Sequence, residues 1–176
     1  IRALCMDPDI NLDKKVYHSE MSHISRNRAI AYLLESKGYI EKNKDVENSL
    51  HFYVKMCSLS VTAESLAGLG LILANDGIHP DTGKRLLSSQ AVKIVKTLMF
   101  TCGMYDGSGE FAVRVGIPSK SGVGGGILSV VDGEMGIGIF GPALDKKGNS
   151  VAGECVLEYM SHELHLHMFD PQRHTL

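Results

Sequence analysis

The stretch from Pro118 to Val131, P-S-K-S-G-V-G-G-G-I-L-S-V-V, combines residue types that could take part in acyl transfer. A basic residue and a hydroxyl precede glycines that lead into an apolar, β-branched run, so charge and bare backbone would lie at one end of a buried strand. Glycines let a substrate approach the main chain closely, and backbone N–H groups could then stabilise a developing oxyanion. A glycine-rich strand without any chemistry fits the same residues, and both interpretations stay open.

A second glycine-rich segment, C-G-M-Y-D-G-S-G from Cys102 to Gly109, precedes this stretch. It places Tyr105 in a predicted turn, which is an unusual position for an aromatic ring whose only role is packing. The phenol could relay a proton if a nearby cation lowered its pKa. A tyrosine that simply fills a loop is the alternative.

Three further residues could bind a polar ligand. Glu20 and Asn27 lie in the polar segment 16–27, which we predict to be a surface or cleft loop, although such groups are usually just solvated. Tyr53 lies on the apolar stripe of a predicted helix and is interpreted, taken alone, as a buried core residue.

Two other patterns do not support a metal or a cofactor. His162, His165 and His167 lack the H-E-x-x-H spacing of a zinc protease and are interpreted as solvated helix histidines. The glycines from Gly122 to Gly126 lead into a strand, whereas a dinucleotide-binding loop leads into a helix. We therefore predict no metal and no cofactor.

Composition limits the class of protein. The 176 residues fit one domain, and a net charge of −2 provides no basic face for nucleic acid, so a small polar ligand is the expected partner. The most apolar stretch, 66–74, is far shorter than the ~20 residues of a membrane-spanning helix, so no membrane segment is predicted. Cys5, Cys57, Cys102 and Cys155 are far apart and indicate reduced core residues of an intracellular protein.

Apolar spacing and capping residues predict five helices. They cover about 28–38, 46–57, 63–75, 89–103 and 150–168. The third is apolar on all sides and should be the central helix, with small residues for close packing. The expected buried stripes of the others are Ala29, Ile30, Leu33 and Leu34; Val46, Leu50, Tyr53, Val54 and Cys57; Ala91, Val92, Val95, Leu98 and Met99; and Ala152, Cys155, Val156, Tyr159, Met160, Leu164 and Met168.

Two antiparallel strands are predicted at 126–131 and 135–140, because Asp132-Gly133 between them is a strong hairpin signal. The segment 111–115 is ambiguous. Helices followed by a hairpin and a packing helix indicate the α+β class.

Taken in order, these segments resemble the serine-dependent glutaminases, which are relatives of the β-lactamases and penicillin-binding proteins. Lys120-Ser121-Gly122 resembles the K-T-G element of that superfamily, on the strand that borders the active site. The other matching segments are Ser19-Glu20, Arg26-Asn27-x-Ala29-Ile30, Phe52-Tyr53, Cys57-Ser58, Val61-Thr62, Leu73-Ala74-Asn75-x-Gly77, Cys102 to Asp106, Ser119 to Val123, Gly125 to Leu128 and Pro142-x-Leu144-Asp145-x-x-Gly148-Asn149-Ser150.

The resemblance implies a β-lactamase-like fold and hydrolysis of L-glutamine through a serine acyl-enzyme. Glu20 would bind the α-ammonium group of the substrate, while Asn27 and Tyr53 would hold its α-carboxylate. Tyr105 would assist proton transfer, and the Val123 N–H would be an oxyanion donor. Lys120, Ser121 and Gly122 would support the site.

The superfamily nucleophile belongs to a Ser-x-x-Lys motif, and no serine of this chain has a lysine three positions later. The chain also begins with Ile1 rather than Met. We therefore expect residues 1–176 to be the C-terminal portion of a single glutaminase domain that lacks its N-terminal part, including any targeting peptide. Such a fragment should be inactive by itself, and its sheet should have an open edge.

Two rival functions stay open: a β-lactamase or peptidase, and a non-catalytic domain that binds amino acids or a protein partner. The glutaminase resemblance further implies a homo-oligomer, either a dimer or a tetramer. It also implies a cytoplasmic location, or a mitochondrial one if the source is eukaryotic.

Overall fold

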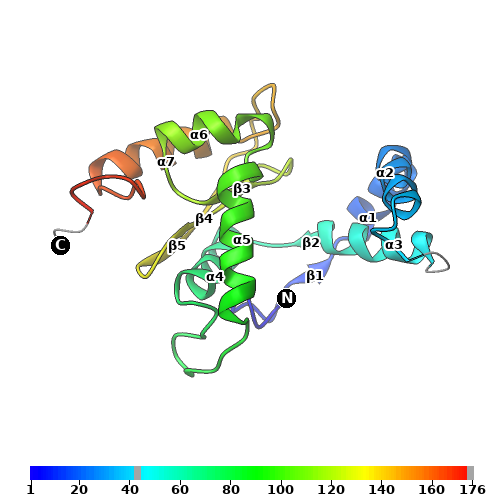
Figure 1. Cartoon of the computed structure of the whole chain (residues 1–176), viewed down its shortest axis with the longest axis horizontal. Coiled ribbons are helices and arrows are strands. Elements are labelled where there is room, and N and C mark those ends of the chain that lie inside the picture. Colours follow the sequence, from blue (N-terminus) through cyan, green and yellow to red (C-terminus); the bar gives the residue numbers. More distant parts are fainter. Residues whose placement is uncertain (42–44, 174–176) are drawn as a thin grey trace. The chain divides into compact units, whose positions relative to one another are not determined.

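The computed structural model describes residues 1–41 and 45–173, which form two compact units (Figure 1). The helical unit comprises residues 9–61. The sheet unit comprises residues 1–8 and the residues from 62 onward.

The helical unit consists of α1 (Lys14–Ser22), α2 (Ser25–Ser36) and α3 (Val46–Cys57), and short strands β1 (Asn11–Leu12) and β2 (Leu59–Ser60) pair its two ends. The Asp45 side chain accepts a hydrogen bond from the Asn48 N–H at 3.0 Å and caps α3, as predicted. Helix α3 packs against both α1 and α2. The buried core of the unit consists of Ile24, Ala31, Val46, Leu50 and Val54. Helices predicted at about 28–38 and 46–57 are thus confirmed.

Helix α1 occupies part of the segment that we predicted to be a loop, so that prediction is wrong. The Asp13 side chain caps the helix by accepting hydrogen bonds from the Lys15 and Val16 N–H groups at 2.8 and 3.0 Å. Tyr17 and Met21, one helical turn apart, pack against the unit's core. Two apolar residues in a polar segment were too weak a pattern to indicate a helix.

The buried face of α2 differs from the predicted one, and the buried face of α3 is narrower than predicted. Helix α2 buries only Ala31, while Leu33 of the predicted stripe is 57% exposed. On α3 the buried residues follow a strict four-residue spacing, which leaves Tyr53 52% exposed and Cys57 exposed as well. The interpretation of Tyr53 as a core residue is therefore wrong.

The sheet unit contains one antiparallel sheet of order β3-β4-β5. Its strands are β3 (Ser119–Ser121), β4 (Gly126–Val131) and β5 (Met135–Phe140), and the pairing of Val131 with Met135 confirms the predicted hairpin. Three-residue β3 is too short for periodicity to reveal. Within the described residues, β5 pairs only with β4.

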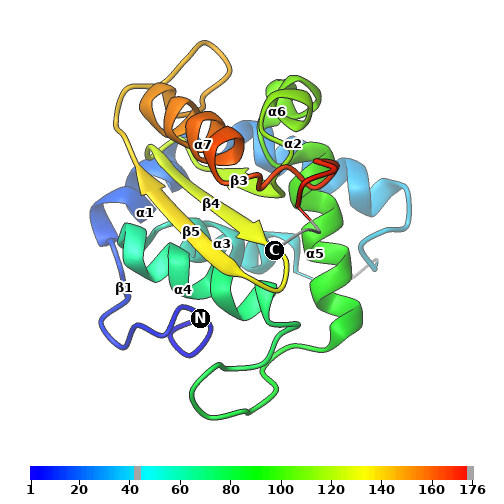
Figure 2. The ribbon, with the colours of Figure 1, turned by 90° about the vertical axis from the view of Figure 1, so that its left-hand side faces the viewer.

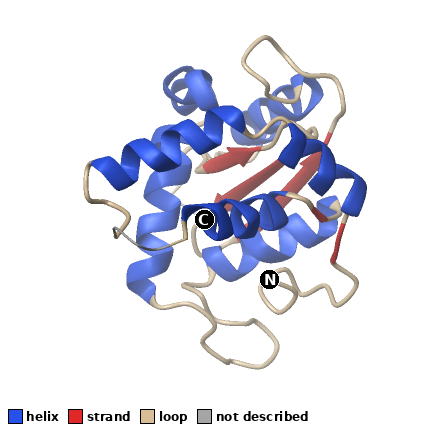
Figure 3. Cartoon of the chain, turned by 90° about the vertical axis from the view of Figure 1, so that its right-hand side faces the viewer, coloured by secondary structure: helices blue, strands red, loops and turns tan. Residues whose placement is uncertain are grey.

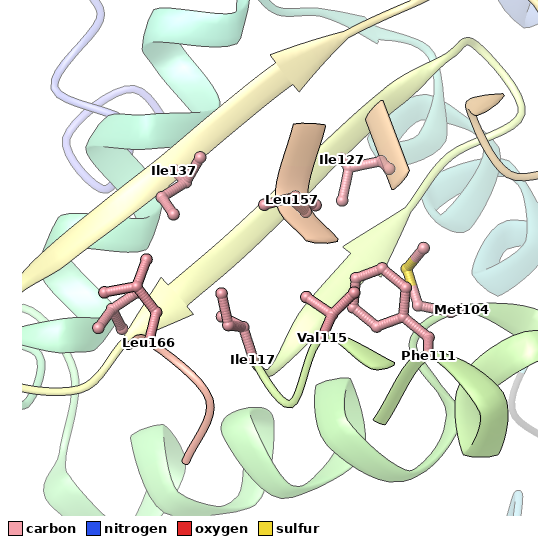
Figure 4. Packing of buried hydrophobic residues seen from close by; sticks show 9 residues of the cluster. Met104, Phe111, Val115, Ile117, Ile127, Ile137, Leu157 and Leu166 are labelled. Carbon is pink, nitrogen blue, oxygen red and sulfur yellow. The ribbon is translucent and has the colours of Figure 1, made fainter. Parts of the chain in front are cut away.

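Helices cover both faces of this sheet (Figures 2 and 3). Helices α4 (Ala63–Ala74) and α5 (Ser89–Cys102) pack on one face, where Leu128 and Val130 of β4 join their core. Helices α6 (Ser108–Arg114) and α7 (Val151–Glu163) pack on the other, where Ile127 of β4 meets Phe111 and Leu157 (Figure 4). This alternation along β4 follows from the two-residue period of a strand. The α+β class is confirmed.

Helix α4 is the central helix, as predicted, and lies unusually close to β5. A methyl group added at Gly138 would lie 1.8 Å from the Ala63 carbonyl oxygen, and one at Gly70 would lie 2.7 Å from the Gly136 Cα. Glycines on both sides thus permit direct contact between the two backbones. The small residues of α4 were predicted to allow close packing. No such role was predicted for the glycines of β5.

Other parts of the predicted helices need correction. Helix α7 ends at Glu163, not at 168, and its buried residues are Gly153, Leu157 and Ser161. Of the predicted stripe, Met160 packs against the core, whereas Tyr159 is 68% exposed. On α5, the residues Val92 and Met99 are buried as predicted, but Val95 and Leu98 are exposed.

The cysteines also differ from the prediction, because Cys5 alone is buried while Cys57, Cys102 and Cys155 are exposed. The ambiguous segment 111–115 belongs mostly to α6. None of the helices in the described part of the chain is long and apolar enough to cross a membrane.

Candidate functional site

Tyr105 begins a single turn of 3-10 helix, η1 (Tyr105–Gly107), between α5 and α6. Its φ of +51° lies in the left-handed region, which costs a non-glycine residue about 1 kcal/mol. The buried Ser108 holds this conformation: its Oγ donates to the Tyr105 carbonyl oxygen at 2.8 Å and accepts from the Met104 N–H at 3.0 Å. The ring is 39% exposed, so the phenol is accessible to a ligand.

Lys120 of β3 supplies the cation next to this tyrosine. Its Nζ lies 4.7 Å from the centre of the Tyr105 ring, within the range of a cation–π contact. The same ammonium group donates to the carbonyl oxygen of Ser121. The two glycine-rich segments found in the sequence therefore meet at this pair.

Val123 lies at the tip of the β3–β4 turn and is 68% exposed. The turn is closed by hydrogen bonds from Gly122 N–H to Gly126 O and from Gly125 N–H to Gly122 O, both 2.9 Å. Among the described residues, the Val123 N–H donates to no backbone carbonyl. It is therefore available to an incoming oxyanion.

The side chains of Tyr105 and Val123 both lie beside Gly148. A methyl group added at Gly148 would lie 3.6 Å from Cε2 of Tyr105 and 3.6 Å from Cγ1 of Val123. Gly148 belongs to the turn that begins at Asp145. The Asn149 and Lys147 N–H groups donate to the Asp145 carboxylate and hold its pKa below the usual range.

Segments 102–109 and 118–131 are also joined directly. The Ser121 N–H donates to the Gly103 carbonyl oxygen at 3.1 Å, and the buried Ser121 side chain donates to Asn149 Oδ1 at 2.6 Å. Sequence patterns did not indicate Ser108 or Asn149. Asn149 entered only as part of the glutaminase resemblance, because an isolated polar residue in a loop has no periodic signal.

The other predicted site residues, Glu20, Asn27 and Tyr53, belong to the helical unit, one on each of its helices. Glu20 is exposed, Asn27 is half-buried in the first turn of α2, and Tyr53 is exposed on α3. They place a carboxylate, an amide and a phenol on helices that pack together.

Two contacts lock these helices. Arg28 of α2 donates two hydrogen bonds to Glu47 of α3, at 2.8 and 3.0 Å. A 2.6 Å hydrogen bond joins the Tyr17 hydroxyl of α1 to Nδ1 of His51 on α3. The helical unit thus holds three predicted ligand-binding residues on a braced scaffold, while the sheet unit brings together Tyr105, Lys120 and Val123.

The histidines lie outside both groups. His162 is exposed in the last turn of α7, and Nδ1 of His165 lies 3.1 Å from the Asp170 carboxylate. Within residues 1–41 and 45–173, no group of three or more histidine, cysteine or acidic residues could hold a metal ion. These histidines line a groove of about 770 Å³ beside α7, and a second cavity of about 360 Å³ lies beside α5. Neither is lined by Tyr105, Lys120 or Val123.

Comparison with known proteins gives a consistent family. The family model described as Glutaminase matches residues 1–169. Glutaminases of Clostridium tetani and Fusobacterium nucleatum are 54% and 55% identical to the chain over 168 residues, which is 96% of the chain and 54% of each relative. The chain thus spans about half the length of the curated relatives that it matches.

Solved structures agree. A crystal structure of a Bacillus glutaminase at 4.3 M NaCl matches 96% of the chain with a TM-score of 0.88 and 40% identity, over 57% of its own length. The Bacillus subtilis glutaminase YbgJ, in covalent complex with 5-oxo-L-norleucine, matches 96% of the chain with a TM-score of 0.89 and 40% identity, over 59% of its length.

Proposed function

The chain belongs to the glutaminase family, with its α+β, β-lactamase-like fold, and we propose that its full-length protein hydrolyses L-glutamine to L-glutamate and ammonia. A serine would attack the side-chain carboxamide and form an acyl-enzyme as ammonia leaves. Water would then release L-glutamate from that serine.

The observation that carries this proposal is the convergence of Tyr105, Lys120 and Val123 in the sheet unit. An N–H without a backbone partner supports a role for Val123 in stabilising the tetrahedral oxyanion. The exposed phenol of Tyr105 would carry the proton to the departing ammonia. Lys120 would hold the ring in place through its contact with the ring face.

The helical unit would bind the amino-acid end of the substrate. Glu20 would accept hydrogen bonds from the α-ammonium group, and Asn27 and Tyr53 would donate to the α-carboxylate. These residue types match a zwitterion, which needs acceptors at one end and donors at the other. The YbgJ complex supports an amino-acid substrate, because 5-oxo-L-norleucine has the α-amino and α-carboxyl groups of glutamine.

We further propose that this chain is the C-terminal portion of one domain whose remaining part contributes the nucleophilic serine and its lysine. The absence of Ser-x-x-Lys here and the coverage of 54% of the relatives support this division. The full-length protein is proposed to form a dimer or tetramer, which sedimentation equilibrium would measure.

The test is ammonia release by the full-length protein with L-glutamine, compared with L-asparagine and a chromogenic cephalosporin. We expect turnover of L-glutamine and no hydrolysis of the cephalosporin. Cephalosporin hydrolysis without glutamine turnover would favour the β-lactamase function instead. Binding of glutamine in a calorimeter with no turnover of any of the three would favour a non-catalytic domain.

A further inference from the structure

We propose that Asn149 is the positioning residue that sets the Tyr105 phenol and the Val123 N–H relative to each other. This inference rests on the proposed function, because it assigns Asn149 a role in the same site. Asn149 itself is completely buried and would not touch the substrate.

The Asn149 side chain bridges the two segments that carry these groups. Its Oδ1 accepts a hydrogen bond from Ser121 Oγ at 2.6 Å, and its Nδ2 donates to the Met104 carbonyl oxygen at 3.2 Å. Ser121 is two residues before Val123, and Met104 is bonded directly to Tyr105. A single planar amide therefore fixes the bases of both loops.

The backbone of Asn149 is also tied down. Its N–H donates to the Asp145 carboxylate at 2.8 Å, within the turn that contains Gly148. Gly148 in turn faces the Tyr105 ring and the Val123 side chain. The Asn149 backbone is thus anchored to Asp145. Its side-chain amide joins the segment that carries Tyr105 to the segment that carries Val123.

The amide chemistry is specific. Aspartate would keep an acceptor for Ser121 but would place a carboxylate oxygen opposite the Met104 carbonyl, where no hydrogen bond can form. Alanine at position 121 would remove the opposite arm and leave Asn149 Oδ1 without its partner. Asn149→Asp thus removes one of the two donors to the Met104 carbonyl oxygen, which keeps the Gly107 N–H at 3.0 Å, whereas Ser121→Ala leaves the buried Asn149 Oδ1 without its donor.

The kinetic test uses Asn149→Asp and Ser121→Ala in the full-length protein. A displacement of the reacting groups by 1 Å can lower the rate of a reaction by about 100-fold. We therefore expect kcat for glutamine to fall on the order of 10- to 100-fold in Asn149→Asp, and KM to change by less than about 3-fold. Because both variants break the same bridge, the double variant should lose less than the product of the two single losses.

Ser161→Ala is the matched control. Ser161 is buried, and its Oγ donates to the Val115 carbonyl oxygen at 2.5 Å, so this variant, like the two test variants, removes one buried hydrogen bond. Its bond lies between α7 and the end of α6, outside the predicted site. We expect a loss of thermal stability similar to that of Ser121→Ala, since neither variant buries a charge, but a kcat within about 2-fold of the unmodified protein.

Hydrogen exchange separates this inference from the proposed function, since it needs no turnover. In Asn149→Asp, the amides of 104–107 and 122–125 should exchange faster, and in Ser161→Ala they should not. Faster exchange in a protein that does not hydrolyse glutamine would support the bridge and reject the reaction. The inference would be overturned if Asn149→Asp had the same exchange rates and kcat as Ser161→Ala. If Asn149→Asp does not fold, the same comparison is made between Ser121→Ala and Ser161→Ala.

Discussion

At the scale of single residues, Tyr105, the proposed proton-transfer residue, has an unusual backbone conformation. Its φ is positive, which is unfavourable for a tyrosine; the Ser108 hydroxyl donates to the Tyr105 carbonyl oxygen and holds this conformation, while Lys120 contacts the ring. Strained positions persist where surrounding contacts determine them, and they are common at functional sites. Val123, which like Tyr105 lies beside Gly148, is the proposed oxyanion donor, so the two residues would act together in acyl transfer.

Substitutions at this scale should separate chemistry from binding. In the full-length protein, Tyr105→Phe removes the proton-transferring hydroxyl and should lower kcat about 100-fold or more, with KM nearly unchanged. Glu20→Gln removes the charged acceptor for the α-ammonium group and should mainly raise KM, by roughly 10-fold or more. Steady-state ammonia release measures both. A Tyr105→Phe variant with normal kcat and a raised KM would show that the phenol binds substrate instead.

At the scale of elements, the contact between α4 and β5 organises the sheet unit. The glycines of β5 let the α4 backbone rest directly on the strand, and this contact supports the sheet from which the β3–β4 turn projects. The position of Val123 thus depends on the packing of α4 against β5, although Val123 belongs to neither element.

Gly138→Ala should therefore be destabilising, because the new methyl group would collide with the Ala63 carbonyl oxygen. Overpacking of this kind costs about 1–3 kcal/mol. Gly109→Ala is the control, since a methyl group there meets open space on α6 and should be neutral or stabilise the protein by up to ~1 kcal/mol. Denaturant unfolding measures both free energies, and equal stability of the two variants would contradict the close-contact account.

At the scale of the whole molecule, the predicted site residues divide between two compact units, with Glu20, Asn27 and Tyr53 in one and Tyr105, Lys120 and Val123 in the other. The unit that would recognise the amino acid is thus built separately from the unit that would stabilise the transition state. Neither unit contains a Ser-x-x-Lys motif.

The nucleophile should consequently lie outside residues 1–176. The full-length protein, treated with 6-diazo-5-oxo-L-norleucine, should form a covalent adduct that peptide mass spectrometry assigns to a serine outside this range. The isolated 176-residue chain should form no adduct and release no ammonia. An adduct on any serine within residues 1–176 would refute the division of the site.

The sequence by itself determined the elements whose signals are local. Asp45 and Thr62 cap helices as predicted, Ser88 is one of the two serines expected to cap α5, and Asp132-Gly133 forms the predicted hairpin, because caps and tight turns depend on neighbouring residues. The motifs also identified the family before any contact was known.

Tertiary structure alone decided which faces are buried and which residues meet. The stripes of α2 and α7 and the side chain of Tyr53 are more exposed than periodicity indicated, because an apolar spacing predicts a face but not the neighbour that covers it. The same limit applies to the site. Lys120 over Tyr105, and Asn149 between Ser121 and Met104, are contacts between residues far apart in the chain, and such contacts exist only once the backbone has folded.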